Sequence, residues 1–218
     1  MKTNEEVWSI VNELKALYPD SLCSLEYEKD YELLFSVRLA AQCTDERVNK
    51  VTPALFARFP TLESLAQADV AEVEQYIHST GFFRAKARDI VLASQMLLRD
   101  YGGKVPGTME ELLKLPGVGR KTANLMLGDV FHVPGVVVAD THCIRITGLL
   151  GLTDGSKDPA KVEMQLRQVL PPEESNDFCH RMVLHGRAVC IARRPQCESC
   201  TLRPWCDHFA QNRAGANA

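Results

Sequence analysis

The chain has 218 residues, of which 45% are hydrophobic and 24% charged, and its formal net charge is −3. This balance is typical of a globular protein with one large domain or two small ones, and the net charge does not by itself indicate a nucleic-acid-binding protein. The chain has no apolar run of about 18 residues, which excludes a membrane-spanning helix, and its start, MKTNEEVWSI, lacks the apolar segment of a signal peptide, so we expect a cytoplasmic protein.

Most of the chain shows the periodicity of amphipathic helices. The segments YELLFSVRLAAQ (31–42) and RAKARDIVLASQMLLRDYGG (84–103) carry apolar residues at helical spacing, and the second ends at paired glycines that favour helix termination. Further helices are predicted over 69–77, 108–115 and 158–170, because each begins with residues that favour a helix start. These residues are the capping-box pairs Asp69 with Glu72 and Thr108 with Glu111, and Asp158 as an N-cap before Pro159.

One segment, VPGVVVAD (133–140), has extended character, and it is too short to build a sheet. The sequence has no repeat array and no low-complexity region, and its tail QNRAGANA is expected to fray. We therefore predict an all-α architecture of about ten short helices.

The segment LPGVGRKTANLMLGDVFHVPGVVVADTH (115–142) combines a glycine turn, a lysine and an aspartate. The PGVG turn can join two helices tightly, because glycine tolerates positive φ and close backbone approach. A turn in this place directs bare backbone N–H groups out of a helix N-terminus, which is a phosphate site that needs no positive side chain. The helix is predicted to begin near Gly119, and its apolar face contains Ala123, Met126, Leu127 and Val130.

Lys121 lies in the first turn of that helix and off its apolar face. The positive end of the helix dipole disfavours the ammonium form there, and partial burial would act in the same direction. A neutral lysine amine is a nucleophile that forms a Schiff base with a carbonyl carbon. The simpler interpretation is a lysine that contacts phosphate or is solvated.

Asp140 precedes another apolar-periodic segment, THCIRITGLL (141–150), so it is a candidate N-cap. A capping carboxylate is also held rigid and ionised. It could then face a positive charge that develops on a sugar, or help to deprotonate the lysine. The structural and the catalytic interpretations are compatible.

Eight cysteines fall into two groups. Four are scattered in apolar helical surroundings and are interpreted as small buried hydrophobic residues: Cys23, Cys43, Cys143 and Cys179. The other four, in a C-x6-C-x2-C-x5-C run, are interpreted as metal ligands: Cys190, Cys197, Cys200 and Cys206. The spacing alone leaves both Zn²⁺ and a [4Fe–4S] cluster open, and the metal could serve only to hold a small domain together.

The charge of the C-terminal region differs from that of the N-terminal region. Residues 1–40 are acidic, whereas residues 178–213 carry six arginines against Glu198 and Asp207. A basic segment is a weak indication of phosphate binding, and a solvated arginine-rich surface explains it equally well. The loop IARRPQ, between Cys190 and Cys197, could project against a DNA backbone.

Several of these segments together resemble the endonuclease III family of DNA base-excision glycosylases. LPGVGRKTAN resembles the family's helix–hairpin–helix, ADTH resembles its VDTH element with Ala139 in place of valine, and the cysteine run is similar to its [4Fe–4S] loop. LAAQCTDERVN (39–49) and STGFFRAKA (79–87) resemble two further family segments. The resemblance extends from residue 5 to residue 210.

The resemblance implies two helical domains with a DNA-binding cleft between them. A six-helix domain with the hairpin would cover 22–132, residues 1–21 and 133–212 would form the cluster domain, and 213–218 would be a disordered tail. The cleft would accept a nucleotide that is flipped out of the duplex, because an enzyme cannot reach its target atom inside the stack. A [4Fe–4S] cluster would be bound by the four clustered cysteines.

The resemblance also implies roles for individual residues. Lys121 would be the nucleophile and Asp140 its carboxylate partner, while Gln42 would fill the space left by the extruded base. Phe82 stands where the family has a leucine wedge, so the shape of that wedge differs here. The remaining expected DNA contacts are Gly117, Val118, Gly119, Arg120, His142, Arg193 and Arg194.

These roles predict a bifunctional DNA glycosylase/AP lyase of base excision repair. It would remove oxidised pyrimidines from double-stranded DNA through a lysine Schiff base and cut the strand 3′ to the abasic site by β-elimination. We expect a monomer, associated with the nucleoid if the source is bacterial. One alternative is an adenine glycosylase, whose branch lacks the lysine and usually has an extra domain. The other is a non-catalytic iron–sulfur DNA-binding or redox protein, which would need neither Lys121 nor Asp140.

Overall fold

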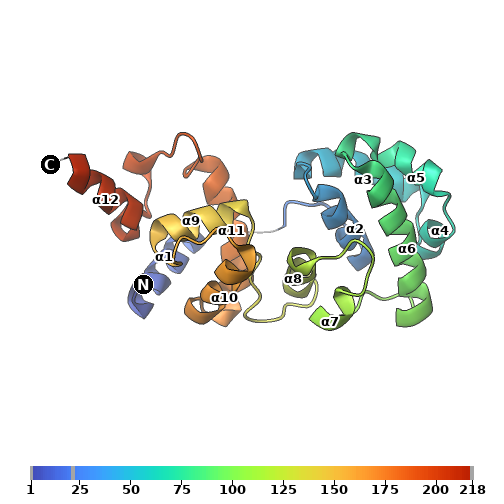
Figure 1. The fold of residues 1–218 in the computed structure, drawn as a ribbon, viewed down its shortest axis with the longest axis horizontal. Helices are drawn as coiled ribbons and strands as arrows, with labels where there is room; N and C mark the ends of the chain where they lie inside the picture. Colours follow the sequence, from blue (N-terminus) through green and yellow to red (C-terminus); the bar gives the residue numbers. More distant parts are fainter. Residues whose placement is uncertain (1, 21–22, 217–218) are drawn as a thin grey trace. The chain divides into compact units, whose positions relative to one another are not determined.

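The computed structural model describes residues 2–20 and 23–216 (Figure 1). Within these ranges the chain forms α-helices and short 3-10 helices and has no β-strand, which confirms the predicted all-α class. Among the described helices, none combines the length and the apolar character that a bilayer crossing requires. The segment predicted to be extended, 133–140, is irregular backbone that buries Val136, Val137 and Val138.

The chain folds into two compact units. One unit, here called the terminal unit, comprises Met1–Leu22 and His132–Ala218, and the other, the central unit, comprises Cys23–Phe131. Each unit has its own apolar core, so each is described separately below.

The helices of the central unit contact one another in one continuous network. Helix α6 (Phe83–Tyr101) packs against α4 (Leu62–Ala66) and α5 (Val70–Ile77), and α2 (Asp30–Ala40) packs against α3 (Asp45–Arg58) and α8 (Arg120–Asp129). Two short elements complete the unit, namely η1 (His78–Thr80) and α7 (Met109–Leu112). Its core contains Leu33, Phe35, Ile77, Ile90 and Met126, all almost fully buried.

The terminal unit is organised around α11 (Ser175–Ala188), which packs against α1 (Asn4–Leu17) and α9 (Thr141–Leu150). Its core contains Ile10, Leu14, Ile146, Phe178 and Met182. The remaining elements are α10 (Pro159–Val169), η2 (Pro172–Glu174), η3 (Cys197–Ser199), η4 (Arg203–Trp205) and α12 (Asp207–Ala216).

Most of the predicted helix boundaries match the structure. Asp158 caps α10 by accepting a bond from the Ala160 N–H, and Gly102, with φ of 60°, ends α6. At α5 the predicted capping box is wrong. Asp69 caps the helix through the Ala71 N–H, whereas Glu72 forms an ion pair with Arg58 at 2.6 Å and is drawn toward α3.

Two predicted boundaries require correction. Helix α7 ends at Leu112 instead of continuing to 115, because the chain then turns and the Leu115 carbonyl accepts a bond from the Val118 N–H. The tail predicted to be disordered from residue 213 is helical as far as Ala216, since α12 contains no proline and several good helix formers. Residues 217–218 lie outside the described part of the chain.

Candidate functional site

The glycine turn between α7 and α8 has the geometry of an exposed helix N-terminus. Gly119 is the N-cap of α8, with φ of −101° and ψ of 177°, and no side-chain bond caps the helix. The first-turn N–H groups of α8 therefore have no capping side chain to accept from them. Such N–H groups, together with the helix dipole, favour binding of a phosphate. The predicted start of α8 near Gly119 is confirmed.

An ion pair that the sequence analysis missed lies against this turn. Arg38 of α2 donates to the Asp89 carboxylate of α6, with Nε–Oδ2 and Nη2–Oδ2 distances of 2.9 and 2.7 Å. Gly117 has φ of 75°, and a Cβ at this position would lie 2.6 Å from Arg38 Nε. The turn thus requires glycine for both its backbone conformation and its close approach to the ion pair.

Lys121 lies in the first turn of α8, where its side chain is exposed. The sequence had suggested that the Lys121 side chain could be partly buried, and the structure does not show this burial. The predicted apolar face is largely confirmed, because Ala123, Met126 and Leu127 are buried and Val130 is half-buried. This face anchors α8 in the central unit and leaves Lys121 directed away from the core.

Asp140 in the terminal unit is the N-cap of α9. Its Oδ1 accepts a hydrogen bond from the Cys143 N–H at 2.7 Å, and its own N–H donates to the Val138 carbonyl at 2.9 Å. The predicted capping role is therefore confirmed. The bonds hold the half-buried carboxylate in one orientation, as the catalytic interpretation also requires.

Gln42 and Phe82 share an unusual backbone conformation. Their φ angles are 56° and 47°, and within the described residues only His132, with φ of 50°, is another non-glycine residue in this region. Both side chains are exposed, and that of Phe82 is 68% exposed. A left-handed conformation of a non-glycine residue is unfavourable, and such strain is concentrated at functional sites.

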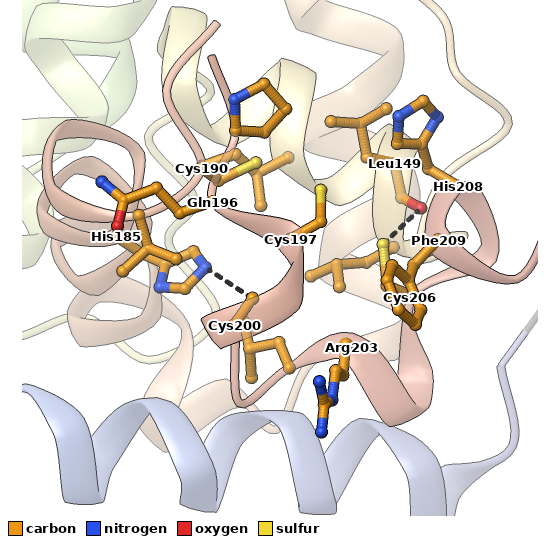
Figure 2. A pocket seen from close by; sticks show the side chains of 15 residues that line it. Leu149, His185, Cys190, Gln196, Cys197, Cys200, Arg203, Cys206, His208 and Phe209 are labelled. Atoms are coloured by element: carbon orange, nitrogen blue, oxygen red, sulfur yellow. Dashed lines mark hydrogen bonds between the residues drawn. The ribbon is translucent and has the colours of Figure 1, made fainter. Parts of the chain in front are cut away.

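The four clustered cysteines line one pocket (Figure 2). Its walls are mainly apolar and include Ile146, Leu150, Val189 and Leu202. All eight cysteines of the chain lie in the described residues and are free thiols. As the described side chains are placed, no three His, Cys, Asp or Glu residues surround a single metal ion.

Polar groups contact three of the four pocket cysteines. Arg145 Nη1 lies 3.5 Å from Cys190 Sγ and donates to the Cys190 carbonyl at 2.7 Å. The Cys200 sulfur lies 3.6 Å from His185 Nε2, and the Cys206 sulfur lies 3.5 Å from the Leu149 carbonyl oxygen. Burial raises the pKa of the Cys190, Cys200 and Cys206 thiols. A bound metal would reverse this preference, because it binds the thiolate.

Arg145 and His185 were not identified from the sequence. Burial, with a smaller contribution from Arg145, lowers the pKa of His185 to about 4, so this histidine is neutral near pH 7. Its Nδ1 lies 3.2 Å from the Tyr18 hydroxyl. For Arg145, the indication in the sequence was a charged residue within the apolar-periodic segment 141–150.

The other predicted DNA contacts have different environments. His142 is half-buried at α11, where a Cβ on Gly186 would lie 2.2 Å from its Nδ1. Arg120, Arg193 and Arg194 are exposed, and Val118 is half-buried. Of the scattered cysteines, Cys143 and Cys179 are buried as predicted, whereas Cys23 and Cys43 are only half-buried.

Comparison with known proteins agrees with this arrangement. Residues 35–172 match the HhH-GPD superfamily of base excision DNA repair proteins. The chain is 49% identical over 193 residues to endonuclease III of Synechocystis sp. strain PCC 6803, covering 88% of each chain. It is 37% identical over 199 residues to endonuclease III of Escherichia coli strain K12, covering 91% of this chain and 93% of the relative.

Solved structures give the same result. A trapped endonuclease III–DNA covalent intermediate superposes with a TM-score of 0.90 at 39% identity, over 98% of this chain and 100% of that one. A thermostable thymine-DNA glycosylase, with a TM-score of 0.82 at 20% identity, shares the fold over 95% of this chain and 98% of that one. From the matched segment and these relatives, the chain belongs to the endonuclease III family within the HhH-GPD superfamily of base excision DNA repair proteins.

Proposed function

We propose that this protein is a bifunctional DNA glycosylase/AP lyase of base excision repair. It would remove oxidised pyrimidines from duplex DNA and cut the strand 3′ to the abasic site. The observation that carries the proposal is the exposed Lys121 in the first turn of α8, directly after the hairpin. A similar chain, 39% identical over its full length, has been solved as a covalent intermediate with DNA.

The hairpin is proposed to fix the DNA backbone. The N–H groups of Gly117, Val118 and Gly119 and the first turn of α8 would bind a phosphate, and the exposed Arg120 would add a positive charge. Gln42 and Phe82 would occupy the space left in the duplex when the damaged nucleotide leaves the stack. Flipping costs a few kcal/mol, and less for a poorly stacked base, which contributes to selectivity.

Lys121 is proposed to carry out the covalent chemistry. Its neutral amine attacks C1′ of the nucleotide, the N-glycosidic bond breaks, and the bonding electron pair leaves with the base, which is then protonated. The sugar ring opens as the amine forms a Schiff base. This cation acidifies the C2′ proton, and loss of that proton expels the 3′ phosphate by β-elimination. Water then hydrolyses the Schiff base, which frees Lys121 and leaves an unsaturated aldehyde on the cut strand.

Asp140 is proposed as the carboxylate that assists Lys121. One of its oxygens is engaged by the Cys143 N–H, so the carboxylate is held in a fixed orientation at the start of α9. It would stabilise positive charge on the sugar and accept a proton from the attacking amine. His142, Arg193 and Arg194 are proposed as further DNA contacts.

We also propose a domain division and a [4Fe–4S] cluster. One domain would cover 22–132, and the other would combine 1–21 with 133–212. The two compact units support this division.

Four free cysteines around one largely apolar pocket fit a [4Fe–4S] cluster, which takes four cysteine ligands. A bound cluster would hold the segment 190–206 together through bonds to its four cysteine thiolates. We place the protein in the cytoplasm, where it would meet DNA as a monomer.

A duplex that carries a single thymine glycol tests this function. The expected product is a cut strand with an unsaturated aldehyde at its 3′ end, because β-elimination leaves the sugar remnant there. Base removal without a cut would contradict the lyase activity. A duplex with adenine opposite an oxidised guanine distinguishes the adenine-specific alternative, for which release of adenine alone would be expected.

A further inference from the structure

Lys86, in α6, is fully buried, although lysine is among the residues that are most rarely buried. Its ammonium donates to the carbonyls of Leu39 and Thr80, each at 2.8 Å. Burial lowers the pKa of Lys86; nearby Cys43 opposes this shift, and Arg38 adds to it. A buried cation is unfavourable unless its hydrogen bonds are satisfied. The two bonds satisfy the Lys86 ammonium, and what remains to be explained is why a lysine is buried at this position.

The two carbonyl groups belong to the ends of two helical elements. Leu39 lies in the last turn of α2, and Thr80 is the last residue of η1. Carbonyls in the last turn of a helix lack intrahelical partners, and the negative end of the helix dipole favours a cation there. Lys86 therefore donates to two helix-end carbonyl groups that an apolar side chain of equal size would leave without this hydrogen bond.

A residue with positive φ follows each of these two helix ends in the sequence. Gln42 follows Leu39 by three positions, and Phe82 follows Thr80 by two. The backbone N–H of Lys86 also donates to the Phe82 carbonyl at 3.2 Å. One residue thus bonds to both segments that present an exposed side chain in a left-handed conformation.

We propose that Lys86 is a positioning residue that fixes the Gln42 and Phe82 segments relative to each other, so that both side chains enter the duplex together. This inference rests on the proposed function, because it assigns the two side chains to the gap left by the flipped nucleotide. A strained backbone conformation persists only where the surrounding structure enforces it. Lys86 contributes to this constraint through its hydrogen bonds inside the central unit. Lys86 itself is fully buried, so its side chain is not accessible for contact with DNA.

The test compares borohydride trapping of the protein on abasic duplex and on the same abasic strand without its complement. The single strand has no opposing base and no gap to fill, so a defect in the inserted side chains affects only the duplex. Lys86→Met should slow duplex trapping at least tenfold and change single-strand trapping less than twofold. Ser94→Ala is the matched control, because it removes another buried α6 hydrogen bond, to the Ile90 carbonyl, without touching either segment.

Three results would overturn the inference: equal loss of trapping on both substrates, no loss on the duplex, or the same loss in Ser94→Ala. If Lys86→Met does not fold, Lys86→Gln retains a donor on a shorter side chain and should show a smaller loss confined to the duplex. In the Gln42→Ala/Phe82→Ala background, Lys86→Met should cause no further duplex-specific loss. Failure of the wild-type protein to trap on either substrate would instead refute the proposed function, and with it this inference.

Discussion

Arg38 and Asp89 form an ion pair whose guanidinium and carboxylate lie directly against the hairpin turn at Gly117. The pair joins α2 to α6, and both side chains are largely buried, with exposed fractions of 21% and 18%. The turn that we propose to bind a phosphate is therefore supported by charged side chains from two other helices.

Gly117→Ala should lower the free energy of unfolding by about 2–4 kcal/mol, because it combines positive φ with a Cβ close to Arg38 Nε. Chemical denaturation measures this change. The matched control is Gly102→Ala in the same unit, where φ is 60° and a Cβ would meet no atom within 4 Å. Only the backbone strain applies there, so a loss of about 1 kcal/mol is expected. Equal losses in the two variants would argue against the contact with the ion pair.

Arg38→Met should destabilise the protein by about 1–3 kcal/mol, since it leaves the Asp89 carboxylate poorly solvated and without its cation. The double variant Arg38→Met/Asp89→Leu should recover part of that loss, so that the double-mutant cycle gives a coupling of about 1 kcal/mol or more. The exposed pair Lys114–Glu110, at 2.9 Å, provides the comparison and should couple by less than about 0.5 kcal/mol. Additive effects of Arg38 and Asp89 would contradict this account.

Much of this architecture could be predicted from sequence, because helix periodicity and start residues are local properties. The start of α8 at Gly119 and the N-cap at Asp140 follow from glycine and aspartate chemistry within a few residues. The Arg38–Asp89 pair and the Lys86–Leu39 bond join residues that are 51 and 47 positions apart, so periodicity could not reveal them. For the same reason the sequence did not predict that Glu72 would leave its capping position to pair with Arg58.

Asp154 should make the stability pH-dependent at low pH. The ion pair with Lys161, at 2.5 Å, and the bond from the Ser156 N–H hold the pKa of its carboxyl at about 2, below the ordinary value of 3.8. The unfolded chain therefore takes up this proton first, and the stabilisation is present above about pH 4 and lost as the pH falls toward 2. The melting temperature of Asp154→Asn should fall short of that of the wild type above pH 5, and the difference should shrink below pH 4. A constant difference from pH 6 to pH 2 would refute this assignment.

Cys197→Ser should prevent stable assembly of the proposed cluster, because it removes one of the four pocket thiols. Protein prepared without oxygen should contain about four iron atoms per chain and absorb broadly in the visible range, and the variant should lose most of both. Cys23→Ser, which changes a half-buried cysteine of the central unit, is the control and should retain the iron. A colourless, folded, zinc-loaded wild-type protein would contradict the iron–sulfur assignment.

The most direct measurement is to locate the covalent bond between the protein and DNA. Borohydride reduction during reaction with an abasic duplex, followed by proteolysis and mass spectrometry, should place the sugar remnant on Lys121. Lys121→Ala should abolish the trapped adduct, whereas Lys114→Ala, which changes an exposed lysine just before the hairpin, should retain it. Undiminished trapping by Lys121→Ala, or an adduct mapped to another residue, would contradict the central claim.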